Sequence, residues 1–411
     1  MKIKNTSSNE NIVRSIFLVL ILFCLFLGSL NLINRFYYCI YIAALLFVMV
    51  PGRKLHFDKS FLMLLIFATS LLIFDSSYQT MVTSMIKPFT YPLCYIMGLS
   101  LFPKEESNLD LSHSEKQTSV VIYVASGGVM LHFVLNMLTN RGANTRNVID
   151  FWTKDEMSAT GQATLACLMI AVAAAFLFSK SGKLKKTIAI ASLAIILAYN
   201  LILAGRTIFL LILIVFAVAL LYVIYENKRV KANGKTVKLI FAITSVLMLL
   251  ILLYSSNAFG IRDTLESSNF YNRFFDKNST QAIDDDSRLE NKIYYIEHFF
   301  DRMLGGGHIR REFGHSAHDL YLDVYDEAGI FALISIVFYI LYSIGRAIKC
   351  IRSNNISFET RLLILCIYLI VNIQFWLEPI TRGIPWLLAT YCLIDGAVNS
   401  LLSKEKDLLT E

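Results

Sequence analysis

Residues 207–225 read TIFLLILIVFAVALLYVIY, nineteen residues without a charged side chain. A helix that crosses a bilayer needs about 17–25 mostly apolar residues, so this stretch predicts a membrane-spanning helix. The whole chain of 411 residues has the same character, because it is 56% hydrophobic and only 17% charged, with a mean hydropathy of +0.57. Soluble domains are about 25% charged. The composition therefore favours an integral membrane protein.

Apolar runs of similar length recur along the chain on both sides of this stretch. Together they predict about twelve spans, at residues 14–33, 36–50, 60–74, 81–102, 119–138, 159–179, 187–204, 207–225, 238–254, 329–345, 362–377 and 386–402. The predicted fold class is an all-α polytopic membrane protein. It has three parts: helices 1–9 in residues 1–254, a large polar loop in 255–328, and helices 10–12 with a tail in 329–411.

Lysine and arginine are unevenly distributed among the short loops that join the predicted spans. Alternate loops carry clusters of basic residues: Arg53/Lys54/Lys59, Lys180/Lys183/Lys185/Lys186, Lys228/Arg229/Lys231/Lys235/Lys238 and Arg346/Lys349/Arg352/Arg361. Because such loops face the cytoplasm, both termini are predicted to be cytoplasmic and residues 255–328 extracytoplasmic. Membrane orientation accounts for the net charge of +7, and no nucleic-acid partner is expected.

The seven cysteines lie mostly within apolar runs, and none lies in the long polar loop. Neither a disulfide framework nor a Cys/His spacing typical of a metal site is present in the sequence. We therefore expect no metal and no cofactor.

The polar loop 255–328 contains two segments that predict helices. From Ser287 to Met303, apolar residues recur at the spacing of an amphipathic helix, which Gly305–Gly307 would end. A second helix is expected from His318 to Glu327, leading into the predicted span at Gly329. A chain that is almost entirely membrane-spanning, yet keeps one large loop rich in Arg and His, is expected to carry its chemistry there.

Three arginines lie at predicted membrane edges on the extracytoplasmic side: Arg206, Arg288 and Arg382. Charges at such positions are costly and are candidates for function, and the planar guanidinium is suited to binding phosphate oxygens in a bidentate manner. Each arginine also has a purely structural interpretation. Arg206 would extend to the lipid headgroups, Arg288 would pair with Asp284–Asp286, and Arg382 would pair with Glu378.

His315 and His318 are three residues apart and would share a face of a helix. A metal site would require further ligands, whereas a histidine that titrates near neutral pH can accept a proton from an attacking hydroxyl. The alternative is a histidine that only hydrogen-bonds the loop. Asp319, Asp323 and Glu327 are alternative bases or orienting carboxylates.

Other polar residues near these histidines and arginines are candidate substrate ligands. Backbone N–H groups around Gly306 could approach a phosphate, although a run of glycines also simply ends a helix. Arg310 and Arg311 follow and add positive charge. Trp152, in the segment DFWTKDE (150–156), could stack on a sugar ring or anchor the chain at the membrane surface.

Several of these segments, taken in their order along the chain, resemble the O-antigen polymerase and O-antigen ligase family of bacterial envelope glycosyltransferases. The segments are DFWT (150–153) with ATGQ (159–162); LAGRT (203–207); and Arg288 followed by Gly305–Gly307, HDLYL (318–322) and EAGI (327–330). The resemblance covers roughly residues 150–400. The family usually has Asn where this chain has Asp319, and we assign the family histidine to His318 rather than His315.

The resemblance implies a metal-independent membrane glycosyltransferase of the GT-C type in the bacterial cell (inner) membrane. Its donor would be a saccharide linked to polyprenyl (undecaprenyl) diphosphate. Arg206 and Arg288, with Arg382, would stabilise the leaving diphosphate, and His318 would activate the acceptor hydroxyl. The candidate partners are this lipid-linked saccharide, membrane lipid and a regulator of chain length.

Three functions stay open at this point. The segments around Trp152 and His318 favour a polymerase, which joins repeat units on lipid carriers, over a ligase, which moves a finished glycan to a lipid or protein acceptor. A flippase or transporter of the lipid-linked saccharide would show inverted repeats and broken spans near the middle of the bilayer. The unusual charges of this chain lie instead at predicted membrane edges.

Overall fold

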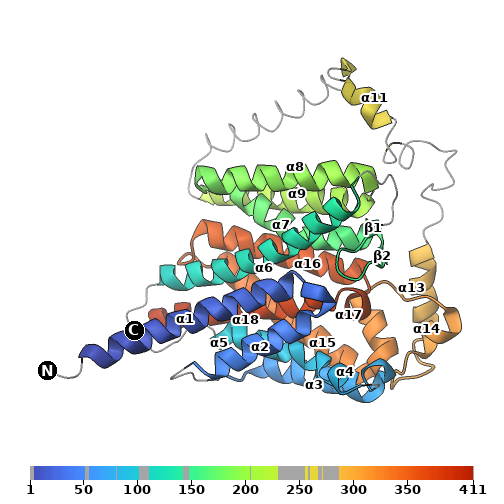
Figure 1. Ribbon diagram of the computed structural model, residues 1–411, viewed down its shortest axis with the longest axis horizontal. Helices are drawn as coiled ribbons and strands as arrows, with labels where there is room; N and C mark the ends of the chain where they lie inside the picture. The colour runs from blue at the N-terminus through green and yellow to red at the C-terminus, as the bar shows by residue number, and fades with distance from the viewer. Residues whose placement is uncertain are drawn as a thin grey trace.

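In the computed structural model the chain forms a bundle of aligned helices (Figure 1). The structure describes residues 4–50, 55–79, 81–100, 111–141, 148–203, 205–229, 255–257, 260–266, 271 and 287–410. The predicted span at 238–254 and the acidic run Asp284–Asp286 lie outside the described residues.

Eight helices within the described residues are long and apolar enough to cross a membrane. They are α1 (Lys4–Ser29), α6 (Leu111–Thr139), α7 (Ala159–Phe178), α8 (Lys183–Leu203), α9 (Arg206–Arg229), α15 (Leu320–Arg352), α16 (Phe358–Leu377) and α18 (Pro385–Thr410). Two shorter apolar helices, α2 (Phe36–Val48) and α3 (Lys59–Phe74), accompany them. The predicted class of an all-α multi-pass membrane protein is confirmed, while the number of twelve spans stays a prediction.

The stretch 81–102 is not the single helix that was predicted. The chain there forms α4 (Val82–Met85), the 3-10 turn η3 (Lys87–Phe89) and α5 (Thr90–Ser100). Pro88 interrupts the apolar run, because proline lacks the N–H that a continuous helix needs. The Tyr41 hydroxyl donates a hydrogen bond to the Ile86 carbonyl at 2.5 Å and holds the break in place.

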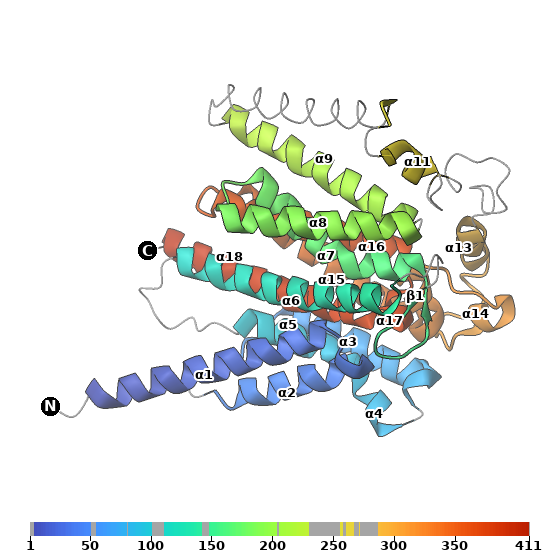
Figure 2. The ribbon, with the colours of Figure 1, turned by 45° about the horizontal axis from the view of Figure 1, so that its top comes forward.

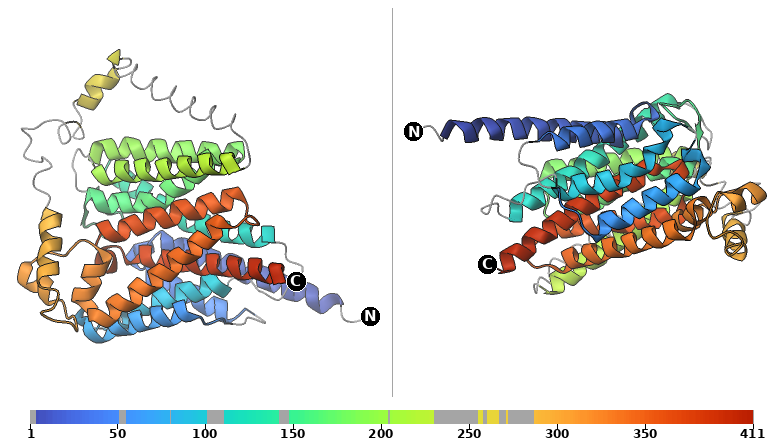
Figure 3. Two further views of the ribbon diagram at one scale, coloured as in Figure 1. Left: turned by 180° about the vertical axis from the view of Figure 1, so that it is seen from behind. Right: turned by 90° about the horizontal axis from the view of Figure 1, so that it is seen from below.

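The two ends of the bundle differ (Figures 1 and 3). Helix α1 begins and α18 finishes at one end, which we call the tail end. The opposite end, called the loop end, carries α13 (Ser287–Glu297), α14 (His308–Phe313), α17 (Ile380–Gly383) and the hairpin of β1 (Val148–Ile149) and β2 (Glu156–Met157). Three short elements complete the described part: η1 (Leu32–Asn34), η2 (Ser76–Tyr78) and α11 (Ile261–Glu266).

Small residues allow close packing at the centre of the bundle. Helix α7 is rich in alanine, is buried along most of its length and packs against α6, α8, α9 and α16. Helices α5 and α18 meet at Gly98 and Gly396, where a Cβ on Gly98 would lie 2.0 Å from the Leu393 carbonyl oxygen. Figure 2 shows α6 and α18 side by side. Close packing is therefore centred on α7 and on the contact between α5 and α18.

The first loop helix ends earlier than predicted. Helix α13 stops at Glu297 rather than Met303. The Phe299 ring stacks on the Tyr325 ring with centroids 3.9 Å apart, and the Tyr325 hydroxyl donates to the Phe299 carbonyl. These contacts with α15 hold Phe299 in a turn, whereas Phe300 and Met303, the other apolar residues of the predicted pattern after Glu297, are exposed.

Helix α15 kinks at Gly329, where φ is +78°. The kink frees the carbonyls of Asp326 and Glu327, which accept hydrogen bonds from N–H groups in the turn Gly305–Gly307, at 2.7 and 2.9 Å. A Cβ on Gly305 would lie only 2.5 Å from the Gly329 nitrogen, so both positions require glycine. The predicted passage from loop helix to span at Gly329 is thereby confirmed, and the glycine turn is the partner of the kink.

Candidate functional site

A cavity of about 450 Å³ opens at the loop end of the bundle. Its size is that of a pocket for a small molecule or a headgroup. Several segments far apart in the chain supply its wall: Asn31, Asn34–Tyr37, Lys87, His132, Asp150, Thr153, Asp155–Ser158, Gly161, Leu165, Glu378, Pro379 and Arg382–Trp386. Charged groups of both signs occur in this wall, and their pairing decides what the cavity can bind.

The N-terminus of α7 forms one side of the cavity. Ser158 caps this helix by accepting a hydrogen bond from the Gly161 N–H at 3.2 Å, and both residues line the cavity. The aligned peptide dipoles of a 20-residue helix place partial positive charge at this end. An anion is therefore favoured at this side of the cavity.

Arg35 and Lys87 supply the basic part of the wall. Lys87 lies 5.1 Å above the Tyr37 ring, and neither Arg35 nor Lys87 forms an ion pair with a carboxylate among the described residues. Burial and the neighbouring Arg35 guanidinium lower the pKa of Lys87, because each disfavours its charged form. Two adjacent cations without a carboxylate partner would be stabilised by a bound anion.

Arg288 and Lys292, one turn apart on α13, dock this helix on the end of α16. Arg288 donates to the Leu377 carbonyl at 3.3 Å and to the Thr160 hydroxyl at 3.4 Å, while Lys292 donates to the Trp376 carbonyl at 2.7 Å. Cations at a helix C-terminus are favourable because they satisfy its free carbonyls. Arg288 thus joins α13, the start of α7 and the end of α16, just outside the cavity wall.

Glu378 follows α16 and is 3% exposed, with one face on the cavity. Its Oε1 lies 3.8 Å from Arg288 Nη2. Burial raises the pKa of the Glu378 carboxyl to about 7, although Arg288 acts in the opposite direction. A carboxyl with this pKa can gain or lose a proton near neutral pH.

Arg382 pairs with partners other than the predicted Glu378. Its guanidinium binds Glu327 of α15 and lies 3.6 Å from Asp75 Oδ1, after α3. Both carboxylates are buried, and together they raise the pKa of Arg382 despite its partial burial, which alone would lower it. Arg382 is therefore largely neutralised by protein carboxylates, and the predicted pairing of Arg382 with Glu378 is wrong.

Other acidic residues at the start of α15 bind loop backbone. Asp319 caps the helix by accepting from the Leu322 N–H at 2.8 Å, and Asp323 accepts from the Ala317 N–H at 2.9 Å. Asp319 also lies 3.3 Å from Lys292. These carboxylates hold the loop in shape, which gives them a structural role that does not need a substrate.

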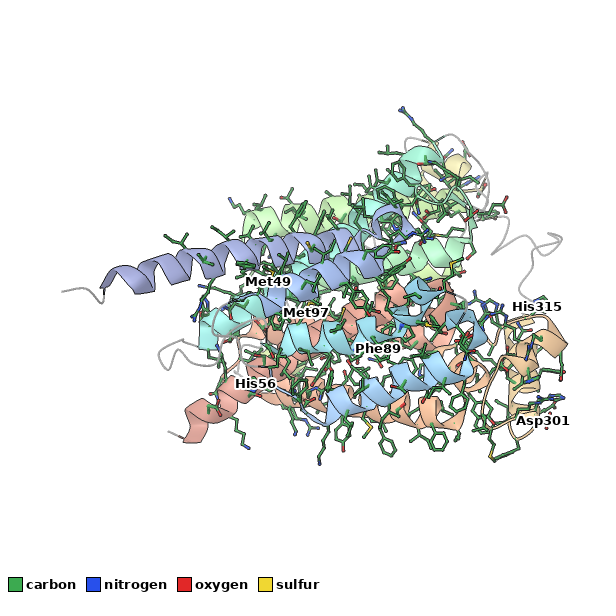
Figure 4. The ribbon with its side chains drawn as sticks, turned by 60° about the horizontal axis from the view of Figure 1, so that its bottom comes forward. Met49, His56, Phe89, Met97, Asp301 and His315 are labelled. Atoms are coloured by element: carbon green, nitrogen blue, oxygen red, sulfur yellow. The ribbon has the colours of Figure 1, made fainter. Side chains whose placement is uncertain are left out.

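His315 and His318 do not share a helix face, because both lie in the turn between α14 and α15. His315 is exposed at the loop end (Figure 4). His318 is half-buried with φ of +58°, a strained conformation for a residue other than glycine, and directly precedes the cap Asp319. Neither histidine lines the cavity.

The glycine turn and its two arginines do not form the predicted phosphate cradle. The Gly306 N–H donates to the Glu327 carbonyl, so it is already used within the protein. The backbone N–H groups of Ile309 and Arg310 donate to the Asp326 carboxylate, which thereby caps the start of α14. Arg311 is exposed and donates to the Gly306 carbonyl at 2.9 Å. This segment stabilises the kink in α15.

The hairpin β1–β2 is fixed to α6 by a buried polar network. Asp150 lies 2.8 Å from His132 Nε2. Burial alone would raise the pKa of Asp150, but hydrogen bonds from His132 and from backbone N–H groups of Thr153 and Trp152 lower it below its usual range. The Trp152 indole N–H donates to the Leu30 carbonyl at 3.1 Å. Trp152 therefore anchors the hairpin to the end of α1 and does not line the cavity.

Arg206 begins α9 at the loop end, and its side chain lies outside the described residues. The preceding Gly205 lies beside the start of α7, because a Cβ on Gly205 would be 3.8 Å from the Ala159 Cβ. The structure thus brings Arg206 and Arg288 to the same helix end, the start of α7.

Of the two remaining tryptophans, Trp376 is 58% exposed as an interface anchor would be, whereas Trp386 is buried in the cavity wall.

Arg35, Lys87, Asp75 and Glu378 were not predicted as site residues. Arg35, Asp75 and Glu378 lie in short segments between the predicted spans, and Lys87 lies within the predicted span 81–102, near its extracytoplasmic end. The sequence pattern of alternating loops therefore places all four on one side of the membrane. Their shared side of the membrane was the sequence signal that could have grouped these four residues. Their proximity depends on the break at Pro88 and on how the helices pack, which no sequence pattern describes.

Among the described residues, no group of three or more His, Cys, Asp or Glu side chains is placed to hold a metal ion. No protein-family model matches the chain, and no curated protein sequence matches it. The inference of function therefore depends on the loop-end cavity.

Proposed function

We propose that the protein is a membrane glycosyltransferase that joins polyprenyl-diphosphate-linked saccharide units into a surface polysaccharide. The observation that carries the proposal is the loop-end cavity, whose wall combines Arg35 and Lys87 with the N-terminus of α7. A diphosphate at this place would meet two cations and a helix dipole of the right sign. The apolar surfaces of the spans would accommodate the polyprenyl tail beside it.

The chemistry of glycosyl transfer fits this distribution of charge. An acceptor hydroxyl attacks the anomeric carbon, and the bond from that carbon to the diphosphate oxygen breaks. Negative charge then grows on the diphosphate, so fixed positive charge in a site shielded from water lowers the barrier. Arg35 and Lys87 would supply that charge, with Arg206 and Arg288 near the start of α7. Arg382 also lines the cavity, but its charge is largely offset by Glu327 and Asp75.

Polymerase, ligase and flippase differ in what becomes of the same donor. A polymerase adds the saccharide to another lipid-linked unit, a ligase transfers it to a different lipid or protein, and a flippase moves the intact lipid across the bilayer. We favour the polymerase because of the resemblance of the segments around Trp152 and His318. In that scheme His318 activates the acceptor hydroxyl.

The proposal is tested with purified protein in liposomes and the lipid-linked repeat unit from the same cell. We expect a ladder of polymer lengths on a gel, with and without EDTA. The variant Arg35→Ala/Lys87→Ala should lower the rate by about 10²–10³-fold, the usual loss when charge stabilisation is removed. The control Lys349→Ala removes an exposed cation at the tail end and should leave the ladder unchanged.

The same assay separates the three functions. Product found only on an added lipid or protein acceptor would identify a ligase. Movement of the intact lipid without any glycosidic product would identify a flippase. A ladder made equally fast by the double variant would show that the basic wall does not bind the diphosphate.

A further inference from the structure

Four buried carboxylates at the loop end, Asp75, Asp323, Glu327 and Glu378, each have one oxygen without a hydrogen-bond partner among the described residues, and of these four Glu378 lines the cavity. It is 3% exposed and lines the cavity, yet its Oε1 atom has no hydrogen-bond partner among the described residues. The nearest cation is Arg288, at 3.8 Å. A buried polar atom normally has a partner, so an incompletely paired carboxylate in a cavity wall is a candidate to contact a ligand.

The neighbouring carboxylates show the contrast. Asp150 and Asp319 accept hydrogen bonds from backbone N–H groups, and Glu327 binds Arg382. Each therefore has a structural partner that holds it in place. Burial raises the pKa of Glu327 to about 7 as well, but Glu327 does not line the cavity. Glu378 has only the distant Arg288, while its burial favours the neutral form and brings its pKa to about 7.

We propose that Glu378 is the general base of the reaction, accepting the proton of the acceptor sugar hydroxyl inside the cavity. This inference depends on the proposed glycosyl transfer and assigns to Glu378 the proton transfer that the sequence assigned to His318. His318 does not line the cavity, whereas Glu378 does. The geometry thus favours Glu378 as the group that touches substrate.

The step balances without a co-reactant. The hydroxyl oxygen forms a bond to the anomeric carbon as its O–H bond breaks, and the proton moves to Glu378. The bond between the anomeric carbon and the diphosphate oxygen breaks, and that oxygen keeps the electron pair. Arg288 stabilises the ionised form of Glu378 before the reaction, and the proton passes to water once product leaves the cavity.

The test measures kcat and KM of the full-length protein in liposomes, with the lipid-linked repeat unit as substrate, over about pH 5 to 9. A base must be ionised, so kcat of the wild-type protein should fall as pH drops through about 7 and level off above it. Glu378→Gln should lower kcat by about 10²–10⁴-fold, leave KM nearly unchanged and abolish that pH dependence. Glu378→Asp should keep a pH-dependent, slower reaction.

Glu312→Gln is the matched control, because Glu312 is exposed on α14 and its loss should change neither kcat nor the pH profile. If Glu378→Gln elutes as aggregate, Glu378→Asp decides, because the pKa of Glu327 is also raised to about 7 and the wild-type pH profile alone does not separate the two carboxyls. A wild-type rate that is flat across pH 7, or a Glu378→Gln variant as fast as wild type, overturns the inference and leaves the proposed function standing. A rise in KM with an intact pH profile would show that Glu378 only positions Arg288. Absence of glycosidic product from wild-type protein at every pH would instead overturn the proposed function, and the inference with it.

Discussion

Arg382 connects its own helix, α17, with two other segments of the loop end. Its guanidinium joins Glu327 on α15 and Asp75 after α3, and both carboxylates are buried. Breaking a buried ion pair costs about 3–5 kcal/mol, because the remaining charge has no partner. The structural contribution of Arg382 is therefore large even if a substrate also contacts it.

For Arg382→Gln we expect a loss of about 3 kcal/mol in the free energy of unfolding, since Glu327 and Asp75 would face each other without a cation. Thermal unfolding of the protein in detergent micelles measures this loss as a lower transition temperature. Arg352→Gln, at an exposed arginine at the tail end, is the control and should leave the transition unchanged. Adding Glu327→Gln to Arg382→Gln should recover stability, and a further loss would contradict the pairing.

At this scale the sequence predicted the importance of the arginines but not their partners. Glu378 is four residues from Arg382 and was the natural partner, yet Arg288 lies closest to it. The true partners come from α15 and from the end of α3, which are far away in sequence. Such pairing depends on helix packing, so local spacing could not predict it.

Helix α13 presents two contrasting faces. Arg288 and Lys292 bind the end of α16, while Leu289, Ile293 and Ile296 are exposed. The helix lies across the loop end, roughly at right angles to the spans (Figure 1). The exposed stripe continues at Met303. The Met303 carbonyl accepts a hydrogen bond from the Ile330 N–H of α15, next to the exposed Phe331. This arrangement is typical of an interfacial amphipathic helix.

We therefore expect Ile296 to lie at the boundary of headgroups and acyl chains. An environment-sensitive fluorescent residue at position 296 should be quenched by brominated lipids in nanodiscs. The same residue at Glu290, an exposed position about 100° around the helix from Leu289, should be quenched less. Equal quenching at both positions, or none at either, would show that the stripe does not contact lipid; quenching that depends on protein concentration would indicate a second copy of the chain.

Periodicity predicted α13 as an element, but it could not predict its end. Apolar spacing continues to Met303, whereas the helix stops at Glu297 because Phe299 stacks on Tyr325. Similarly, hydropathy alone merged α4 and α5 into one span, although Pro88 separates them. Local pattern identifies elements, and contacts between elements set their limits.

The whole molecule is asymmetric along the bundle axis, and this asymmetry determines how it sits in a membrane. Clusters of lysine and arginine accompany the tail end, for instance at Lys183 where α8 begins and Arg352 where α15 finishes. The cavity and α13 occupy the loop end. Because basic loops are retained in the cytoplasm, the tail end should face inward and the cavity outward, where a lipid-linked saccharide awaits transfer.

Cysteine labelling in intact cells measures this orientation. The seven native cysteines are buried or half-buried, so background labelling should be low. Glu312→Cys at the loop end should react with a membrane-impermeant maleimide from outside, and Lys406→Cys near the end of α18 only after the membrane is opened. The reverse pattern would put the cavity on the cytoplasmic face, where the polymerase would meet its donor before export, and the proposed function would have to be abandoned. The expected pattern, in contrast, would place the diphosphate, the acceptor and Glu378 on the same side of the membrane. Glycosyl transfer at the cell surface requires this arrangement.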